Sequence, residues 1–141
     1  MTKILVVEDS RFLRLAMERA LSRAGYDVIT AADGEDAVKK ARANLPALIL
    51  LDLLLPKLTG TDVLKALKKD PATAGIAVVV LTAMSQKNED WLLRDGAFAF
   101  LAKSELALEK GSGTLLAAVA DILRKLHLEV PGGARGSGVK G

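Results

Sequence analysis

Five side chains that could do chemistry follow short aliphatic runs of the sequence. Glu8 and Asp9 come directly after the first run, Asp52 follows the third, Thr82 the fourth and Lys103 the fifth. Three carboxylates brought within a few ångströms repel one another by about 4 kcal/mol per close pair at an effective dielectric constant near 20. A hard divalent cation bound through oxygen would offset this repulsion, and Mg²⁺, which keeps several of its waters, suits such a site.

This combination of residue types is suited to phosphoryl transfer. The reaction requires neutralisation of the charge on an oxyanion, and a metal ion, a lysine and a hydroxyl group around an aspartate supply it. A carboxylate can itself be the nucleophile and form an aspartyl phosphate. The residue types therefore indicate a site that accepts a phosphoryl group, provided that the fold brings them together.

Five aliphatic runs and the helical segments between them must position these residues. The runs lack polar alternation, which is typical of buried parallel strands, and helical patterns separate them along the chain. The expected strands are Lys3–Val7, Val28–Thr30, Ala47–Leu51, Ile76–Leu81 and Phe98–Leu101. The expected helices begin at a Ser10 or Asp9 cap and end near Ala24 before Gly25, cover Glu35–Ala43, run from a Thr61 cap to Lys69, and cover Gln86–Arg94 and about Thr114–Leu128.

Alternating strands and helices predict an α/β fold with helices on both faces of a parallel sheet and right-handed crossovers. In such a sheet functional residues lie at the carboxyl ends of the strands, so the acids, the threonine and the lysine should converge at one edge. The 141 residues fit one domain, expected over residues 1–129. Residues 130–141 hold five of the 12 glycines and indicate a flexible tail or a linker remnant.

Composition excludes several other classes of protein. The sequence has no cysteine and one histidine, His127, which excludes thiolate chemistry, disulfides and histidine-rich zinc sites; we expect His127 to be a surface residue without a catalytic role. The net charge is only +3 and aromatic residues make up 4% of the chain, so nucleic-acid binding is not expected. The longest apolar run is far shorter than a membrane span, and the first residues do not resemble a signal peptide. A cytoplasmic location is expected.

The ordered set of residues at the strand ends resembles the receiver domain of two-component response regulators. The residues that carry the resemblance are Glu8 and Asp9, Asp52 with Pro56 and Gly60 after it, Thr82 and Ala83, Phe100, and Lys103. The resemblance covers residues 3 to about 128 and implies a (βα)5 fold with strand order 2-1-3-4-5. It also implies that Asp52 accepts a phosphoryl group from a histidine kinase or a histidine phosphotransfer protein.

The resemblance implies a role for each site residue. Asp9 and Asp52 would bind Mg²⁺ directly, Glu8 through a water molecule and Leu54 through its backbone carbonyl. The Thr82 hydroxyl would donate to a phosphoryl oxygen, and Lys103 would form an ion pair with it. Thr82 and Phe100 would be the two switch residues. A downstream protein would bind the face formed by 86–94, which includes Trp91, together with 98–101 and the last helix.

Two features depart from the family pattern. Ser104 stands where the family usually has a proline that follows a cis peptide bond, and a cis bond before another residue type costs about 3–4 kcal/mol. We therefore expect the bond between Lys103 and Ser104 to be trans. The segment Ser104–Gly113 is also longer than the usual loop into the last helix, so the position of Lys103 could differ from the family norm.

Other functions remain open to different degrees. A phosphatase of the haloacid-dehalogenase type needs a second acid two residues after the aspartate, where this chain has Leu54. A flavodoxin needs a hydroxyl- and glycine-rich phosphate loop where Glu8 and Asp9 stand, and the glycine motif of a dinucleotide-binding domain is missing. The alternatives that remain are a receiver-like module that acts by protein contact without phosphorylation, and a receiver fragment of a larger hybrid kinase or regulator. No effector follows the receiver in this sequence, so its output would be a protein contact.

Overall fold

The computed structural model describes residues 1–55, 58–83, 93–106, 111–128 and 130–131. Within them, five strands form one parallel sheet in the order β2-β1-β3-β4-β5, as predicted. The strands are β1 (Lys3–Val7), β2 (Asp27–Ala31), β3 (Leu48–Asp52), β4 (Ala77–Thr82) and β5 (Ala99–Ala102). The expected strands at 47–51, 76–81 and 98–101 each begin and end one residue later in the structure, and the strand expected at 28–30 is one residue longer at each end.

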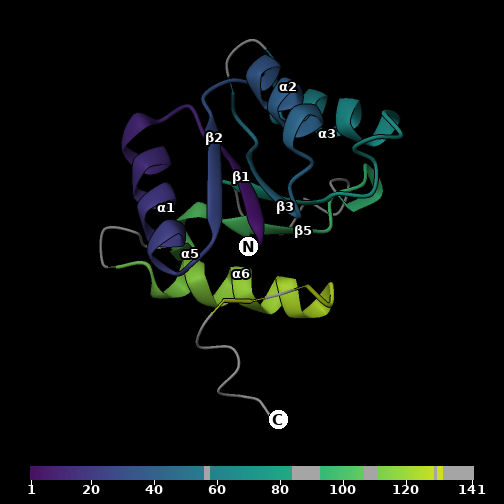
Figure 1. The fold of residues 1–141 in the computed structure, drawn as a ribbon. Helices are drawn as coiled ribbons and strands as arrows, with labels where there is room; N and C mark the ends of the chain where they lie inside the picture. The colour runs from purple at the N-terminus through teal and green to yellow at the C-terminus, as the bar shows by residue number, and fades with distance from the viewer. Residues whose placement is uncertain (56–57, 84–92, 107–110, 129, 132–141) are drawn as a thin grey trace.

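Helices cover both faces of the sheet, which gives three layers (Figure 1). One face carries α1 (Arg11–Arg23) and α6 (Gly113–Lys125), and the short helix α5 (Lys103–Leu106) lies between β5 and α6 in the chain. The other face carries α2 (Gly34–Asn44) and α3 (Gly60–Lys69). The α/β class is therefore confirmed.

The strands divide their side chains between two apolar cores. Alternate residues of each central strand point to opposite faces. Ile4 and Val6 of β1 pack in the core that α1 and α6 cover, whereas Leu5 and Val7 pack in the core that α2 and α3 cover. Because both faces are buried, these strands carry no polar alternation, and their carboxyl edge is the place where polar residues can reach solvent.

Side-chain caps determine where the first helices begin. The Ser10 hydroxyl accepts a hydrogen bond from the Leu13 N–H at 3.3 Å, as predicted, and Asp33 caps α2 in the same way. The prediction that Thr61 caps the next helix is wrong, because the cap of α3 is Thr59. The Gly60 N–H donates to the Leu53 carbonyl at 2.9 Å, so the chain turns into the helix two residues earlier than expected.

The segment after β5 differs most from the expectation. Lys103 is the first residue of α5, and the expected loop at 104–113 begins as helix. Leu106 is buried in the core beneath α1 and α6, which explains why these residues fold onto the body of the protein. The last helix ends at Lys125 and not at Leu128, because the exposed His127 adopts a left-handed conformation with φ 60°.

Some expectations fall partly or wholly outside the described residues. Of the helix expected at 86–94, only residues 93 and 94 are described, and both are helical. Trp91 and Pro56 also lie outside the described part of the chain. The bond between Lys103 and Ser104 is trans, as predicted, since the described residues contain no cis peptide bond. No helix among the described residues has the length and apolar character needed to cross a membrane.

Candidate functional site

Three carboxylates converge at the carboxyl edge of the sheet. Glu8 directly follows β1, Asp52 ends the neighbouring strand β3, and Asp9 begins the turn into α1. One carboxylate oxygen from each of the three residues lies within 4.8 Å of the other two. Glu8 and Asp52 are almost fully buried, with exposed fractions of 1% and 2%, whereas Asp9 is exposed. The cluster therefore has a buried floor and an open side toward solvent.

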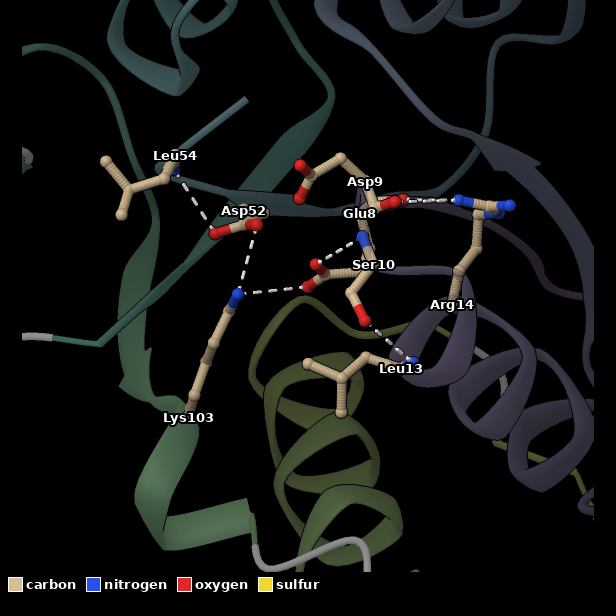
Figure 2. Close-up of polar contacts among 8 residues, drawn as sticks. All are labelled: Glu8, Asp9, Ser10, Leu13, Arg14, Asp52, Leu54 and Lys103. Carbon is tan, nitrogen blue, oxygen red and sulfur yellow. Dashed lines mark hydrogen bonds and ion pairs between the residues drawn. The ribbon is translucent and has the colours of Figure 1, made fainter. Parts of the chain in front are cut away.

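Lys103 extends from the start of α5 to the two buried carboxylates (Figure 2). Its Nζ lies 3.0 Å from Oδ2 of Asp52 and 3.1 Å from Oε1 of Glu8. The side chain is about one quarter exposed. One ammonium group thus faces three carboxylates, and the site as a whole has an excess of negative charge.

Backbone groups hold the two buried acids in place. The Ser10 N–H donates to Oε2 of Glu8 at 3.1 Å, and the Leu54 N–H donates to Oδ1 of Asp52 at 3.2 Å. Within the described residues, Oε1 of Glu8 accepts no hydrogen bond, although Lys103 is near enough for an ion pair. A buried carboxylate oxygen in this state needs a further donor or cation.

The protein environment shifts the pKa values of both partners in the ion pair. Burial, followed by the negative charge of Asp52, raises the pKa of Glu8 above its usual 4.5. Burial lowers the pKa of Lys103, but its hydrogen bond to Asp52 and the charges of Glu8 and Asp52 outweigh this effect, so the pKa rises above 10.5. The pKa of Glu8 is thus raised mainly by burial, whereas that of Lys103 is raised by its two carboxylate partners.

The other predicted residues differ in their position relative to the cluster. Thr82 is buried at the end of β4, and Phe100 of β5 is half-buried and packs against the core under α2 and α3. The Leu54 N–H contacts the cluster, and its side chain is 71% exposed. Gly60 lies against the backbone of Asp52, because a Cβ there would lie 2.5 Å from the Asp52 carbonyl oxygen.

Arg14 also supports the site, although no motif in the sequence indicates this role. Its Nη1 donates to the Glu8 carbonyl at 3.0 Å and to the Asp9 carbonyl at 3.4 Å (Figure 2). The guanidinium thus ties α1 to the turn that carries both acids. The only signal in the sequence is an arginine on the first turns of the helix after Glu8 and Asp9, and such residues are usually solvated.

The donor set fits Mg²⁺. Carboxylate oxygens are the hard ligands that this ion prefers, and an exposed acid beside two buried ones leaves room for retained water. Three carboxylates share one ammonium group, and Oε1 of Glu8 accepts no hydrogen bond from the described residues besides its ion pair with Lys103, so an additional positive group fits here. The residues present therefore match a magnesium site of the kind that phosphoryl transfer uses.

Comparisons with known proteins agree with this geometry. The sequence matches the family described as "Response regulator receiver domain" over residues 4–110. It is 38% identical over 130 residues to the alkaline phosphatase synthesis transcriptional regulatory protein PhoP of Bacillus subtilis. This match covers 92% of this chain and 51% of PhoP. It is 34% identical over 104 residues to the protein PilH of Pseudomonas aeruginosa, with 73% of this chain and 86% of PilH covered.

Solved structures show the same fold. The chemotaxis response regulator CheY4 of Vibrio cholerae aligns with a TM-score of 0.79 and 31% identity, over 87% of this chain and 99% of that one. The chain therefore belongs to the response regulator receiver family, whose members act in two-component signal transduction. It spans about half the length of PhoP and 35% of the probable transcriptional regulator ycf27 of Porphyridium aerugineum.

Proposed function

We propose that this chain is a Mg²⁺-dependent phosphoacceptor in which Asp52 receives the phosphoryl group. The observation that carries the proposal is the pairing of a buried, strand-end aspartate with Lys103 at 3.0 Å, inside a cluster of three carboxylates. The donor is the phosphohistidine of a histidine kinase or a histidine phosphotransfer protein. The chain acts in signalling and accelerates only its own phosphorylation and dephosphorylation, in the cytoplasm.

The proposed step is an in-line displacement at phosphorus. A carboxylate oxygen of Asp52 forms a bond to phosphorus as the bond from phosphorus to the donor imidazole nitrogen breaks. The electron pair of the broken bond stays on that nitrogen. Lys103, which already contacts Asp52, then pairs with the phosphoryl oxygens, and the Thr82 hydroxyl donates to one of them.

Asp9 and Asp52 would bind Mg²⁺ directly, Glu8 through water and Leu54 through its backbone carbonyl. When bound, the ion neutralises charge on the phosphoryl oxygens as the group is transferred. Glu8 and Asp9 leave β1 on consecutive residues, and the Arg14 guanidinium holds both of their carbonyls, so these residues arrive already oriented. Burial of Glu8 and Asp52 keeps water away from their inner sides and strengthens their interaction with any cation.

The output is proposed to be a change of protein contacts. Thr82 and Phe100 lie on the neighbouring strands β4 and β5, so a shift of Thr82 toward a phosphoryl group can be transmitted to Phe100. The surface expected to respond consists of 86–94, 98–101 and α6. Leu93, at the end of the first of these segments, and Phe98, just before β5, are 44% and 40% exposed and are described apolar side chains on this surface.

The test is phosphorylation of the purified chain with Mg²⁺ and acetyl phosphate, followed by intact-mass measurement. One phosphoryl group should be added to the parent and to Asp27→Asn, a control acid exposed at the opposite end of the sheet. Asp52→Asn should gain none. Equal mass gain in Asp52→Asn would assign the acceptor elsewhere, and no gain in the parent would favour the module that acts without phosphorylation.

A further inference from the structure

A second feature adjoins the acidic cluster, a cavity of about 230 Å³ under α5. Its walls are apolar side chains from three elements: Leu13 and Met17 of α1, Leu81 of β4 and Leu106 of α5. All but Leu13 are buried. Protein interiors are normally close-packed, and an apolar cavity of about 150 Å³ is large enough to bind benzene. This cavity therefore has room for a ring and a short chain.

The polar end of the cavity is formed by Glu8, Lys103 and Ser104. In Figure 2 the Lys103 and Leu13 side chains flank the space beneath the Glu8 carboxylate. Glu8 is 1% exposed, and its Oε1, which forms an ion pair with Nζ of Lys103 at 3.1 Å, accepts no hydrogen bond within the described residues. A ligand that offers a hydrogen-bond donor at this end would satisfy that oxygen, whereas a ligand that offers only acceptors would not.

The charge of the acidic cluster determines which hydrogen-bond donor of a ligand fits best. Glu8 lines this end of the cavity and clusters with Asp9 and Asp52. Lys103 is the ammonium group that contacts Glu8 and Asp52, so the cluster keeps an excess of negative charge. An added cation reduces the excess of negative charge on the cluster. Lys103 can keep its contact with Asp52 when the cation binds. An added carboxylate would increase it. The site therefore favours a positively charged head group over a neutral or negative one.

We propose that this cavity binds a small organic cation, with a ring-sized apolar body against Leu13, Met17, Leu81 and Leu106 and a primary ammonium group that donates to Glu8. Such a ligand and Mg²⁺ neutralise the same carboxylates, so each lowers the affinity of the chain for the other. That coupling rests on the proposed magnesium site, whereas binding of the organic cation to the metal-free chain does not.

The first test is titration of the full, metal-free chain with 2-phenylethylamine, followed by calorimetry and by NMR of the side-chain methyl groups. The matched probes are 3-phenylpropanoate, which reverses the charge, and 2-phenylethanol, which removes it. The amine should bind at least about tenfold more tightly than either. Methyl signals of Leu13, Met17 and Leu106 should shift, and those of Leu45, exposed at the end of α2, should not. Equal binding of the three probes, or no binding of the amine, would overturn the proposal.

Variants distinguish binding inside the cavity from a general attraction of cations to the acidic cluster. Glu8→Gln keeps the shape of the cavity and should remove most of the preference for the amine over the alcohol, whereas the control Glu18→Gln, elsewhere on α1, should keep it. Leu13→Phe should fill the space and weaken amine binding at least about tenfold. If Leu13→Phe folds and binds the amine as the parent does, the ligand lies outside the cavity and the proposal is wrong.

Competition with Mg²⁺ completes the test. Saturating Mg²⁺ should weaken amine binding several-fold, compared with KCl at equal ionic strength. If Mg²⁺ binds, as its own titration shows, and amine binding is unchanged, the ammonium group does not pair with these carboxylates and the assignment fails. If Mg²⁺ itself does not bind, the proposed function fails, while the charge preference and the Leu13→Phe result still decide whether the cavity binds the cation.

Discussion

The Glu8 carboxylate is buried beside Asp52, and the Lys103 ammonium contacts both. A carboxylate whose pKa is raised on folding costs stability when it is ionised, since the folded state binds the proton more tightly than the unfolded state. Ionised Glu8 therefore lowers the stability of the metal-free chain, but it adds negative charge to the site. A bound cation would offset this loss of stability.

The first prediction follows from the sign of that shift. Without metal, the contribution of Glu8 to the free energy of unfolding should fall as pH rises above 4.5, its usual pKa. Glu8→Gln should be more stable than the parent by about 1 kcal/mol at pH 8, and this difference should shrink toward pH 4.5. Urea unfolding in EDTA across this range measures it, with Glu18→Gln as the control. A parent that is more stable than Glu8→Gln at pH 8 would contradict the prediction.

The second prediction concerns Arg14. Arg14→Met keeps the apolar stem but removes both donors to the Glu8 and Asp9 carbonyls. Groups that orient metal ligands typically affect metal affinity tenfold or more, so we expect Mg²⁺ to bind about tenfold more weakly. Calorimetric titration should show this loss with little change in the unfolding midpoint, partial recovery in Arg14→Lys, and no loss in Arg19→Met, an exposed position on the same helix. Full Mg²⁺ affinity in Arg14→Met would assign it a purely structural role.

At the scale of elements, the start of α3 packs closely against the end of β3 at Gly60. A Cβ at Gly60 would lie 2.5 Å from the Asp52 carbonyl and 2.6 Å from the Leu53 Cα, and both are backbone atoms that a side chain cannot displace cheaply. The helix therefore approaches β3 as closely as it does only because this residue lacks a side chain.

The third prediction is that Gly60→Ala lowers the free energy of unfolding by about 2–3 kcal/mol and slows phosphorylation of Asp52. The backbone after β3 must move to admit the methyl group, and Asp52 moves with it. Gly75→Ala is the matched control, because nothing lies within 4 Å of a Cβ at Gly75. Thermal unfolding and the intact-mass assay measure the two effects, and equal values for both variants would show that the close contact is unimportant.

The strands and the convergence of the site were predictable for a physical reason. An aliphatic run that ends in a polar residue marks a buried parallel strand and its carboxyl edge, so Asp52 and Thr82 could be placed before any contact was known. Helix α5 was not predictable, because four residues form it and the burial of Leu106 stabilises it. The Arg14 contacts and the ion pair of Glu8 with Lys103 depend on tertiary distances that no local pattern contains.

At the scale of the whole molecule, residues 130 and 131 pack against the body at the edge of the sheet opposite the site. Val130 packs against the core that α1 and α6 cover. Pro131 lies against the turn between α1 and β2, since a Cβ at Gly25 would be 2.8 Å from its Cβ. Composition alone assigns both residues to the glycine-rich tail, because a single valine and proline carry no periodic signal.

The last prediction is that the stable domain extends through Pro131. A chain that ends at Pro131 should unfold at the same temperature as the full chain, whereas a chain that ends at Leu128 should lose about 1 kcal/mol and melt a few degrees lower. Val130→Ala in the full chain should reproduce part of this loss without shortening the chain. Phosphorylation of Asp52 should be equal in all of them, because the contact lies at the far edge of the sheet. Identical melting temperatures would instead place the domain boundary at residue 129, where composition puts it.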